Sequence, residues 1–150
     1  MNPPVFVVDT HALVWFSKGH FRLFGPKALS VMLSNHTRIV IPSFAFIEVQ
    51  YKFSPKMDGK KNSMRVPPTP LLRLVCNCKN VRILPRSPAV LSWEFKLARG
   101  KSSNGISDQD IPIAAATIVA RECYEGQVSL ITKDGTLKQW ATSEGISVIW

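Results

Sequence analysis

Four carboxylates stand out in this sequence because each lies at the edge of an apolar segment, where a strand would end or a helix begin. They are Asp9, Glu48, Asp110 and Asp134. Several anions gathered at such edges would repel one another and raise one another's pKa unless a divalent cation neutralised them. Hard oxygen ligands of this kind select Mg²⁺ or Mn²⁺. The placement therefore predicts a metal site.

The charge balance of the chain points to an anionic partner. The 150 residues include ten Asp and Glu against nineteen Lys and Arg, a formal net charge of +9. No basic amphipathic helix is evident, so nucleic acid is favoured over a membrane surface. Cations held by carboxylates suit phosphodiester hydrolysis, because they acidify a water molecule and neutralise charge that develops on the phosphate oxygens.

Short apolar runs alternate with longer helix-like patterns along the chain. Strands are expected at 5–8, 38–41, 81–84, 128–132 and 146–149, and helices at 10–16, 26–33, 44–51, 87–99, 108–122 and 134–142. This alternation predicts an α/β fold with a central, mainly parallel sheet covered on both faces. Asp9 then follows a strand in the middle of the sheet, and ligands of open α/β sheets bind beyond the carboxyl ends of the strands. The length suits a single domain, residues 1–150.

One segment interrupts this rhythm. Residues 53–70 are rich in Pro, Gly, Ser and Lys, which indicates a basic loop or arm. Between Lys52 and Lys101 there are twelve basic residues against two acidic ones, a net charge of +10 that is sufficient to neutralise several phosphates. The alternative is an ordinary solvated surface. The residues expected to contact the nucleic acid are Lys52, Lys56, Lys60, Lys61 and Arg65.

Four segments of the chain belong together: VFVVDTHALVWF at 5–16, PSFAFIEV at 42–49, SDQDIPIAAAT at 107–117 and LITKDGTL at 130–137. In order and spacing they resemble the four acidic motifs of PIN-domain nucleases, most closely those of VapC-type toxins, and the resemblance covers nearly the whole chain. It implies a three-layer α/β/α PIN-like sandwich and Mg²⁺- or Mn²⁺-dependent endoribonuclease activity on RNA. It also implies a cognate antitoxin protein as partner, and a homodimer.

Within such a site we assign Asp9 as the central metal ligand, because it follows the middle strand, and Asp110 as the second direct ligand. Glu48 and Asp134 are expected to complete the site, directly or through water. Four neighbouring residues are expected to support it, the hydroxyl residues among them being helix-cap or turn residues by default: Thr10, Ser43, Asp108 and Thr132. We expect the last of these to orient a carboxylate or a water molecule.

Single residues of this set also have purely structural interpretations. Asp134 would cap the helix that follows it, and Glu48 would be a solvated helix residue. Asp108 is expected in the first turn of its helix, where it interacts with the helix dipole rather than with metal. His11 is expected to pack or hydrogen-bond near the site rather than to bind a metal ion.

Two other functions remain open. A PIN-like RNA-binding or RNA-processing protein without a toxin role would keep the same carboxylates. A haloacid dehalogenase-type phosphotransferase would use Asp9 as its nucleophile, but that family has the pattern D-x-D, and here His11 stands in place of the second Asp. A neighbouring antitoxin gene would separate the toxin from the first alternative, and covalent phosphorylation of Asp9 would support the second.

A cytoplasmic protein without membrane contact is expected. The first residues are apolar but contain Asp9 and lack a basic leader, so neither a signal peptide nor a transmembrane helix is expected. The odd number of cysteines indicates free, buried thiols in a reducing compartment: Cys76, Cys78 and Cys123. Apolar residues around the first helix supply either a dimer interface or ordinary core: Trp15, Phe16, Phe21, Leu23 and Phe24.

Overall fold

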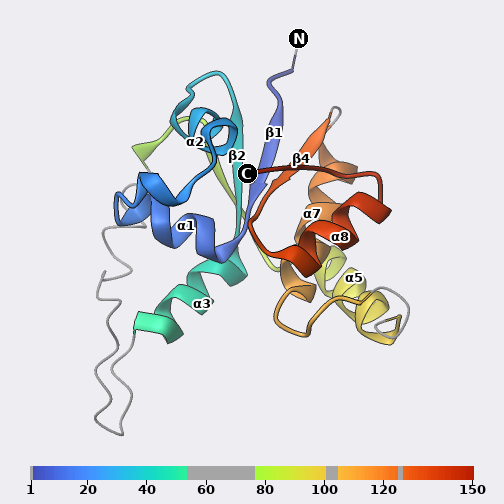
Figure 1. The fold of residues 1–150 in the computed structure, drawn as a ribbon. Coiled ribbons are helices and arrows are strands. Elements are labelled where there is room, and N and C mark those ends of the chain that lie inside the picture. The colour runs from blue at the N-terminus through green and yellow to red at the C-terminus, as the bar shows by residue number, and fades with distance from the viewer. Residues whose placement is uncertain (1, 54–76, 101–104, 125–126) are drawn as a thin grey trace, which may run out of the picture.

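A five-stranded, fully parallel sheet forms the centre of the protein (Figure 1). This computed structural model describes residues 2–53, 77–100, 105–124 and 127–150. The strands are β1 (Val5–Val8), β2 (Arg38–Pro42), β3 (Val81–Leu84), β4 (Val128–Ile131) and β5 (Ser147–Ile149). Their spatial order is β3-β2-β1-β4-β5, so β1 lies in the middle, and the chain builds outward from it first on one side and then on the other.

Helices connect the strands in the alternation that the sequence predicted. They are α1 (Thr10–Ser17), α2 (Pro26–Leu33), α3 (Ser43–Phe53), α5 (Pro88–Arg99), α7 (Ile111–Cys123) and α8 (Gly135–Ser143), with a short 3₁₀ helix η1 (Phe21–Leu23) that was not predicted. The helix expected from residue 108 begins three residues later. Pro112 explains this difference, because proline is tolerated in the first turn of a helix but lacks the N–H that an interior position needs.

The helices cover both faces of the sheet, which confirms the predicted three-layer α/β/α architecture. Alternate residues of β1 point to opposite faces. Val5 and Val7 belong to the core beneath α5, α7 and α8. Phe6 and Val8 belong to the core beneath α1, α2 and α3. Because both faces are buried at the middle of the sheet, β1 is a continuous apolar run rather than an alternating one.

Several features outside the sheet bear on the sequence predictions. The basic arm, with Lys56, Lys60, Lys61 and Arg65, and the side chain of Lys52 lie outside the described residues. The expectation of buried thiols is wrong for Cys123, which is exposed at the end of α7, and Cys78 is half-buried. No described helix has the length and apolar character needed to cross a membrane.

The aromatic residues around α1 form a packed cluster rather than a uniformly exposed patch. The rings of Phe24 and Trp150 stack with centroids 5.2 Å apart, and Trp15 meets Trp150 edge-on at 5.4 Å. Phe21 and Leu23 remain 42% and 41% exposed at the margin of this cluster. Most of the residues proposed as core or interface therefore serve the core of this chain.

Candidate functional site

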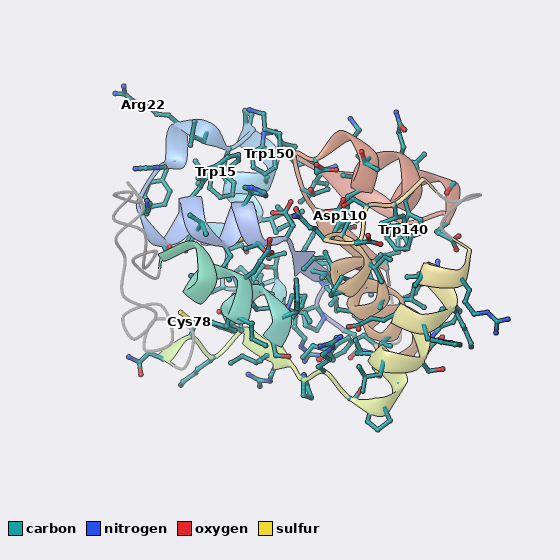
Figure 2. All side chains as sticks on the ribbon, turned by 90° about the horizontal axis from the view of Figure 1, so that it is seen from below. Trp15, Arg22, Cys78, Asp110, Trp140 and Trp150 are labelled. Atoms are coloured by element: carbon teal, nitrogen blue, oxygen red, sulfur yellow. The ribbon has the colours of Figure 1, made fainter. Side chains whose placement is uncertain are left out.

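The four predicted carboxylates line one pocket of about 110 Å³ at the carboxyl edge of the sheet. Each comes from a different part of the fold. Asp9 follows β1, Glu48 lies on α3, Asp110 immediately precedes α7, and Asp134 immediately precedes α8. Figure 2 looks onto the molecule from below and shows Asp110 near its middle, between the helical layers. The pocket lies where the strand order reverses at β1, the usual ligand position in open α/β sheets.

Asp9 is the most buried of the four, with 5% of its surface exposed. Its Oδ1 accepts a hydrogen bond of 2.7 Å from the backbone N–H of Ala12, so Asp9 is the N-cap of α1. Its Oδ2 accepts a hydrogen bond from the hydroxyl of Thr132. Both oxygens are thereby oriented by donors, yet each keeps a lone pair for a further partner.

Thr132 links Asp9 to Asp134. Its Oγ1 donates to Asp9 and accepts a hydrogen bond of 3.0 Å from the backbone N–H of Asp134. Asp134 in turn caps α8, since its Oδ1 accepts from the N–H of Leu137 at 2.8 Å. Asp134 therefore is the helix cap that the structural interpretation predicted, and it lines the acidic pocket as well. Thr132 does contact a carboxylate.

The other two carboxylates also have hydroxyl partners. Thr10 Oγ1 donates to Glu48 Oε2 across the α1–α3 contact. Ser107 Oγ donates to Asp110 Oδ2 at 2.6 Å, which keeps the turn before α7 closed. The sequence suggested Ser107 only as a helix cap. In the structure Asp110 holds the N-cap position, and Ser107 supports its carboxylate.

The pocket makes proton loss from two of its acids harder. Burial raises the pKa of the Asp9 carboxyl. The hydrogen bonds from Thr132 and Ala12 and the nearby His11 oppose that rise, and the charge of Asp134 adds to it. Burial also raises the pKa of the Asp110 carboxyl, with further contributions from the charges of Asp134 and Glu48. These shifts are the expected result of gathering anions in a pocket whose described lining contains no Lys or Arg.

The donors in the pocket suit a hard divalent cation. Carboxylate and hydroxyl oxygens are the ligands that Mg²⁺ and Mn²⁺ prefer. Among the described residues, however, no three His, Cys, Asp or Glu side chains are arranged to hold a metal ion together. The carboxylates of Glu48 and Asp110 are turned toward Thr10 and Ser107. To bind a shared cation these two side chains would have to rotate, which attraction to the cation would favour.

The remaining predicted residues differ in their relation to the pocket. Thr10 and His11 line it, and His11 is exposed with its ring 6.1 Å from that of Trp15. Ser43 was expected to precede α3 as its N-cap, but it is the first helical residue and is not part of the pocket lining. The first-turn position expected for Asp108 is wrong, because the later start of α7 leaves this exposed residue in the preceding turn.

The chain is similar in structure to solved toxin–antitoxin assemblies over almost its whole length. A chain of VapBC2 from Rickettsia felis, solved bound to a DNA fragment from their promoter, matches with a TM-score of 0.62 and 17% identity over 96% of both chains. VapBC-1 from nontypeable Haemophilus influenzae matches with 0.56 and 18% over 96% of both. A toxin–antitoxin complex from Klebsiella pneumoniae matches with 0.54 and 16%, over 96% of this chain and 95% of that one.

In sequence, no protein-family model and no curated protein matches the chain. At identities of 16–18% the structural likeness establishes the fold. The predicted α/β/α sandwich is confirmed, and the chain shares this fold with chains of the solved VapBC and toxin–antitoxin assemblies.

Proposed function

We propose that this protein is a metal-dependent endoribonuclease and the toxin component of a toxin–antitoxin pair. One observation carries the proposal: Asp9, Glu48, Asp110 and Asp134, far apart in the sequence, line a single pocket at the carboxyl edge of the sheet. A structural role alone does not require four like charges in one pocket, because their mutual repulsion destabilises the fold. The net charge of +9 suits a polyanionic substrate that approaches this acidic pocket.

We assign different roles in hydrolysis to the residues of the pocket. Asp9 and Asp110 would hold Mg²⁺ or Mn²⁺ directly, with Glu48 and Asp134 completing the site. When bound, such a cation makes an attacking water more acidic and neutralises charge on the phosphate oxygens. Thr132 and Ala12 keep the Asp9 carboxylate in place. Burial and the charges of Asp134 and Glu48 raise the pKa of the half-buried Asp110 carboxyl in the metal-free pocket, and a bound cation would hold this carboxylate ionised as a ligand.

Partners are proposed from the same resemblance. Structures similar to this chain are VapBC or toxin–antitoxin complexes, which supports an antitoxin protein as the partner of this chain. We also propose a homodimer in the cytoplasm, and RNA contacts by the basic residues near the arm: Lys52, Lys56, Lys60, Lys61 and Arg65.

A cleavage assay on purified protein tests the proposal. Wild type and Asp9→Asn are incubated with single-stranded and structured RNAs in Mg²⁺, in Mn²⁺ and in EDTA. We expect metal-dependent cleavage by the wild type and none by the variant. Glu144→Gln is the matched control, because it removes one exposed carboxylate from the end of α8. Cleavage that persists in EDTA, or in Asp9→Asn, would show that the pocket is not the active site.

An RNA-binding or RNA-processing protein without a toxin role is distinguished by growth. Induced expression of a toxin should arrest the host cell, and Asp9→Asn should restore growth at equal protein level. Cleavage in vitro without arrest would favour a processing enzyme. Phosphate transferred covalently to Asp9 would instead favour the haloacid dehalogenase-type chemistry.

A further inference from the structure

A second pocket lies at the opposite edge of the sheet, where the strands begin. We call it the amino-edge pocket. It has a volume of about 580 Å³ and is formed by the residues before β1, the turn before β2 and the turn that leads into β3. Figure 1 shows this edge beside the label N. Its polar side chains include Asn2, His36, Arg38, Lys79, Asn80 and Arg82.

The amino-edge pocket is positively charged. Arg38, Lys79 and Arg82 give it three cationic side chains, and the described residues that line the pocket include no carboxylate. Within the described part of the chain none of these three residues forms an ion pair. Arg86, by contrast, is neutralised by Glu94 at 2.5 Å. Among the described residues no carboxylate thus competes with an external anion for these cations.

The two guanidinium groups of this pocket are held by contacts within the protein. Arg82 Nη1 donates to the carbonyl oxygens of Lys79 and Val81, each at 2.9 Å, and three further N–H donors remain on the same guanidinium. The guanidinium of Arg38 lies over the ring of Tyr124, 5.2 Å from its centroid. Side chains that are already ordered lose less conformational entropy when they bind a ligand.

We propose that the amino-edge pocket binds the phosphodiester backbone of single-stranded RNA, at a place separate from the acidic pocket. Two guanidinium groups and an ammonium group match phosphate oxygens, and guanidinium binds them through paired hydrogen bonds. The amides of Asn2 and Asn80 add groups that can hydrogen-bond to bases or sugars. The volume is in the range of ligand pockets.

This inference rests on the proposed function for its choice of RNA, and it adds a requirement for substrate length. The two pockets lie at opposite ends of four-residue strands, a separation of roughly 13 Å at 3.3 Å per residue. A dinucleotide, which has a single phosphodiester group, can occupy one pocket only. A longer strand can occupy both, so affinity should rise with length.

Binding without cleavage tests the inference. Fluorescence anisotropy in EDTA compares a long and a very short single-stranded RNA on the wild type and on Lys79→Gln/Arg82→Gln. We expect the double variant to bind the long RNA about tenfold more weakly. The slope of log affinity against log salt should fall by about 1.4, the value for two lost phosphate contacts on a single strand. Binding of the short RNA should fall as well, because in EDTA the acidic pocket holds no cation and repels phosphate, which leaves the amino-edge pocket as the site for a short fragment.

The matched control is Arg22→Gln/Lys27→Gln, which removes one Arg and one Lys from exposed positions on η1 and α2. Figure 2 shows Arg22 pointing away from the protein. The control should keep the wild-type affinity and salt slope. An equal loss in both double variants would reduce the effect to net charge and overturn the inference, as would no loss in either.

Two further measurements keep the test decisive. If the double variant fails to fold, Lys79→Glu replaces it. This single variant retains the hydrogen bonds of Arg82 and is expected to weaken binding of the long RNA. Pyrophosphate and polyglutamate serve as competitors that represent a free phosphate and an acidic peptide. If the variants lose only the binding of a competitor and keep that of RNA, the pocket is not an RNA site. Since EDTA prevents cleavage, failure of the nuclease proposal leaves this result interpretable.

Discussion

Thr132 donates a hydrogen bond to the carboxylate of Asp9, a residue 123 positions away in the sequence. The contact exists because β1 and β4 pair in parallel, with Val8 beside Ile131, so the residues after both strands meet at one edge. Thr132 is fully buried, and its oxygen also accepts from the N–H of Asp134. The hydroxyl of Thr132 thus orients the carboxylate of Asp9, the most buried of the four, and also the turn that contains Asp134.

Replacement of Thr132 by Val should shift the acid limb of the pH–rate profile to higher pH. The hydrogen bond from Thr132 lowers the pKa of the Asp9 carboxyl, so its removal raises that pKa further. Loss of the buried partner should also cost about 1–3 kcal/mol for each polar group left unsatisfied. RNA cleavage rates measured across pH give the first effect, and urea unfolding gives the second.

Thr132→Ser keeps the hydroxyl and serves as the matched control. It should retain the wild-type pH profile while losing about 0.8 kcal/mol for the missing methyl group. A Thr132→Val variant that is merely less stable, with an unshifted acid limb, would mean that Thr132 acts on the fold and not on Asp9.

Asp9→Asn should make the metal-free protein more stable at neutral pH. Because burial raises the pKa of Asp9 in the folded state, the folded protein binds protons at a pH where the unfolded chain has lost them. The contribution of Asp9 to stability therefore falls as pH rises through the raised pKa. Thermal unfolding in EDTA should show a gain in melting temperature for Asp9→Asn that narrows toward about pH 4, near the ordinary carboxyl pKa.

The control Glu144→Gln, which removes an exposed carboxylate at the end of α8, should not reproduce the gain of Asp9→Asn at neutral pH. A difference between Asp9→Asn and wild type that stayed constant with pH, or that grew under acid conditions, would contradict the assigned repulsion and burial. Loss of the fold in Asp9→Asn would also count against a functional role for this carboxylate.

Mn²⁺ should stabilise the wild-type protein and leave Asp9→Asn nearly unchanged. A ligand that binds only the folded state adds about 2.7 kcal/mol when its concentration is one hundred times the dissociation constant. The melting temperature as a function of Mn²⁺ concentration measures this independently of catalysis. Glu144→Gln should respond as the wild type does, whereas equal stabilisation of Asp9→Asn would place the ion elsewhere on the protein.

The ion pair between Arg86 and Glu94 should support the helical layer that contains α7. Arg86 Nη2 and Glu94 Oε2 are 2.5 Å apart, the Glu94 side chain is only 11% exposed, and α5 packs against α7. Arg86→Met leaves a largely buried carboxylate without its partner and should cost about 1–3 kcal/mol in urea unfolding. The double variant Arg86→Met/Glu94→Leu should recover most of that loss. If the single and double variants were equally stable, the ion pair would not be what stabilises this layer.

The helices and strands were largely predictable because each has a recognisable pattern in its own short stretch of sequence. Short β-branched runs such as Val5–Val8 and Arg38–Pro42 form the expected strands, and Pro26 and Pro88 mark helix starts. The error at α7 came from assigning Ser107 as the cap when Pro112 determines the first turn. The η1 helix has no comparable signal, because its three residues make almost no periodic pattern.

The partners of the site residues were harder to predict. A carboxylate at a strand end can be located from sequence, but its hydroxyl donor depends on the register between strands and helices that are distant in the chain. The pairs Thr10–Glu48 and Thr132–Asp9 are of this kind. The amino-edge pocket was missed for the same reason, since Arg38 and Arg82 come together only through the β2–β3 pairing.

The central claim is that the acidic pocket is the nuclease site, and comparison of four single variants tests it most directly. Initial rates of RNA cleavage in Mn²⁺ are measured for Asp9→Asn, Glu48→Gln, Asp110→Asn, Asp134→Asn and the control Glu144→Gln. The account predicts that each pocket variant loses at least about a hundredfold in rate while the control keeps the wild-type rate, since each removes a charge that binds metal or orients water. Near wild-type cleavage by Asp9→Asn and Asp110→Asn would contradict it.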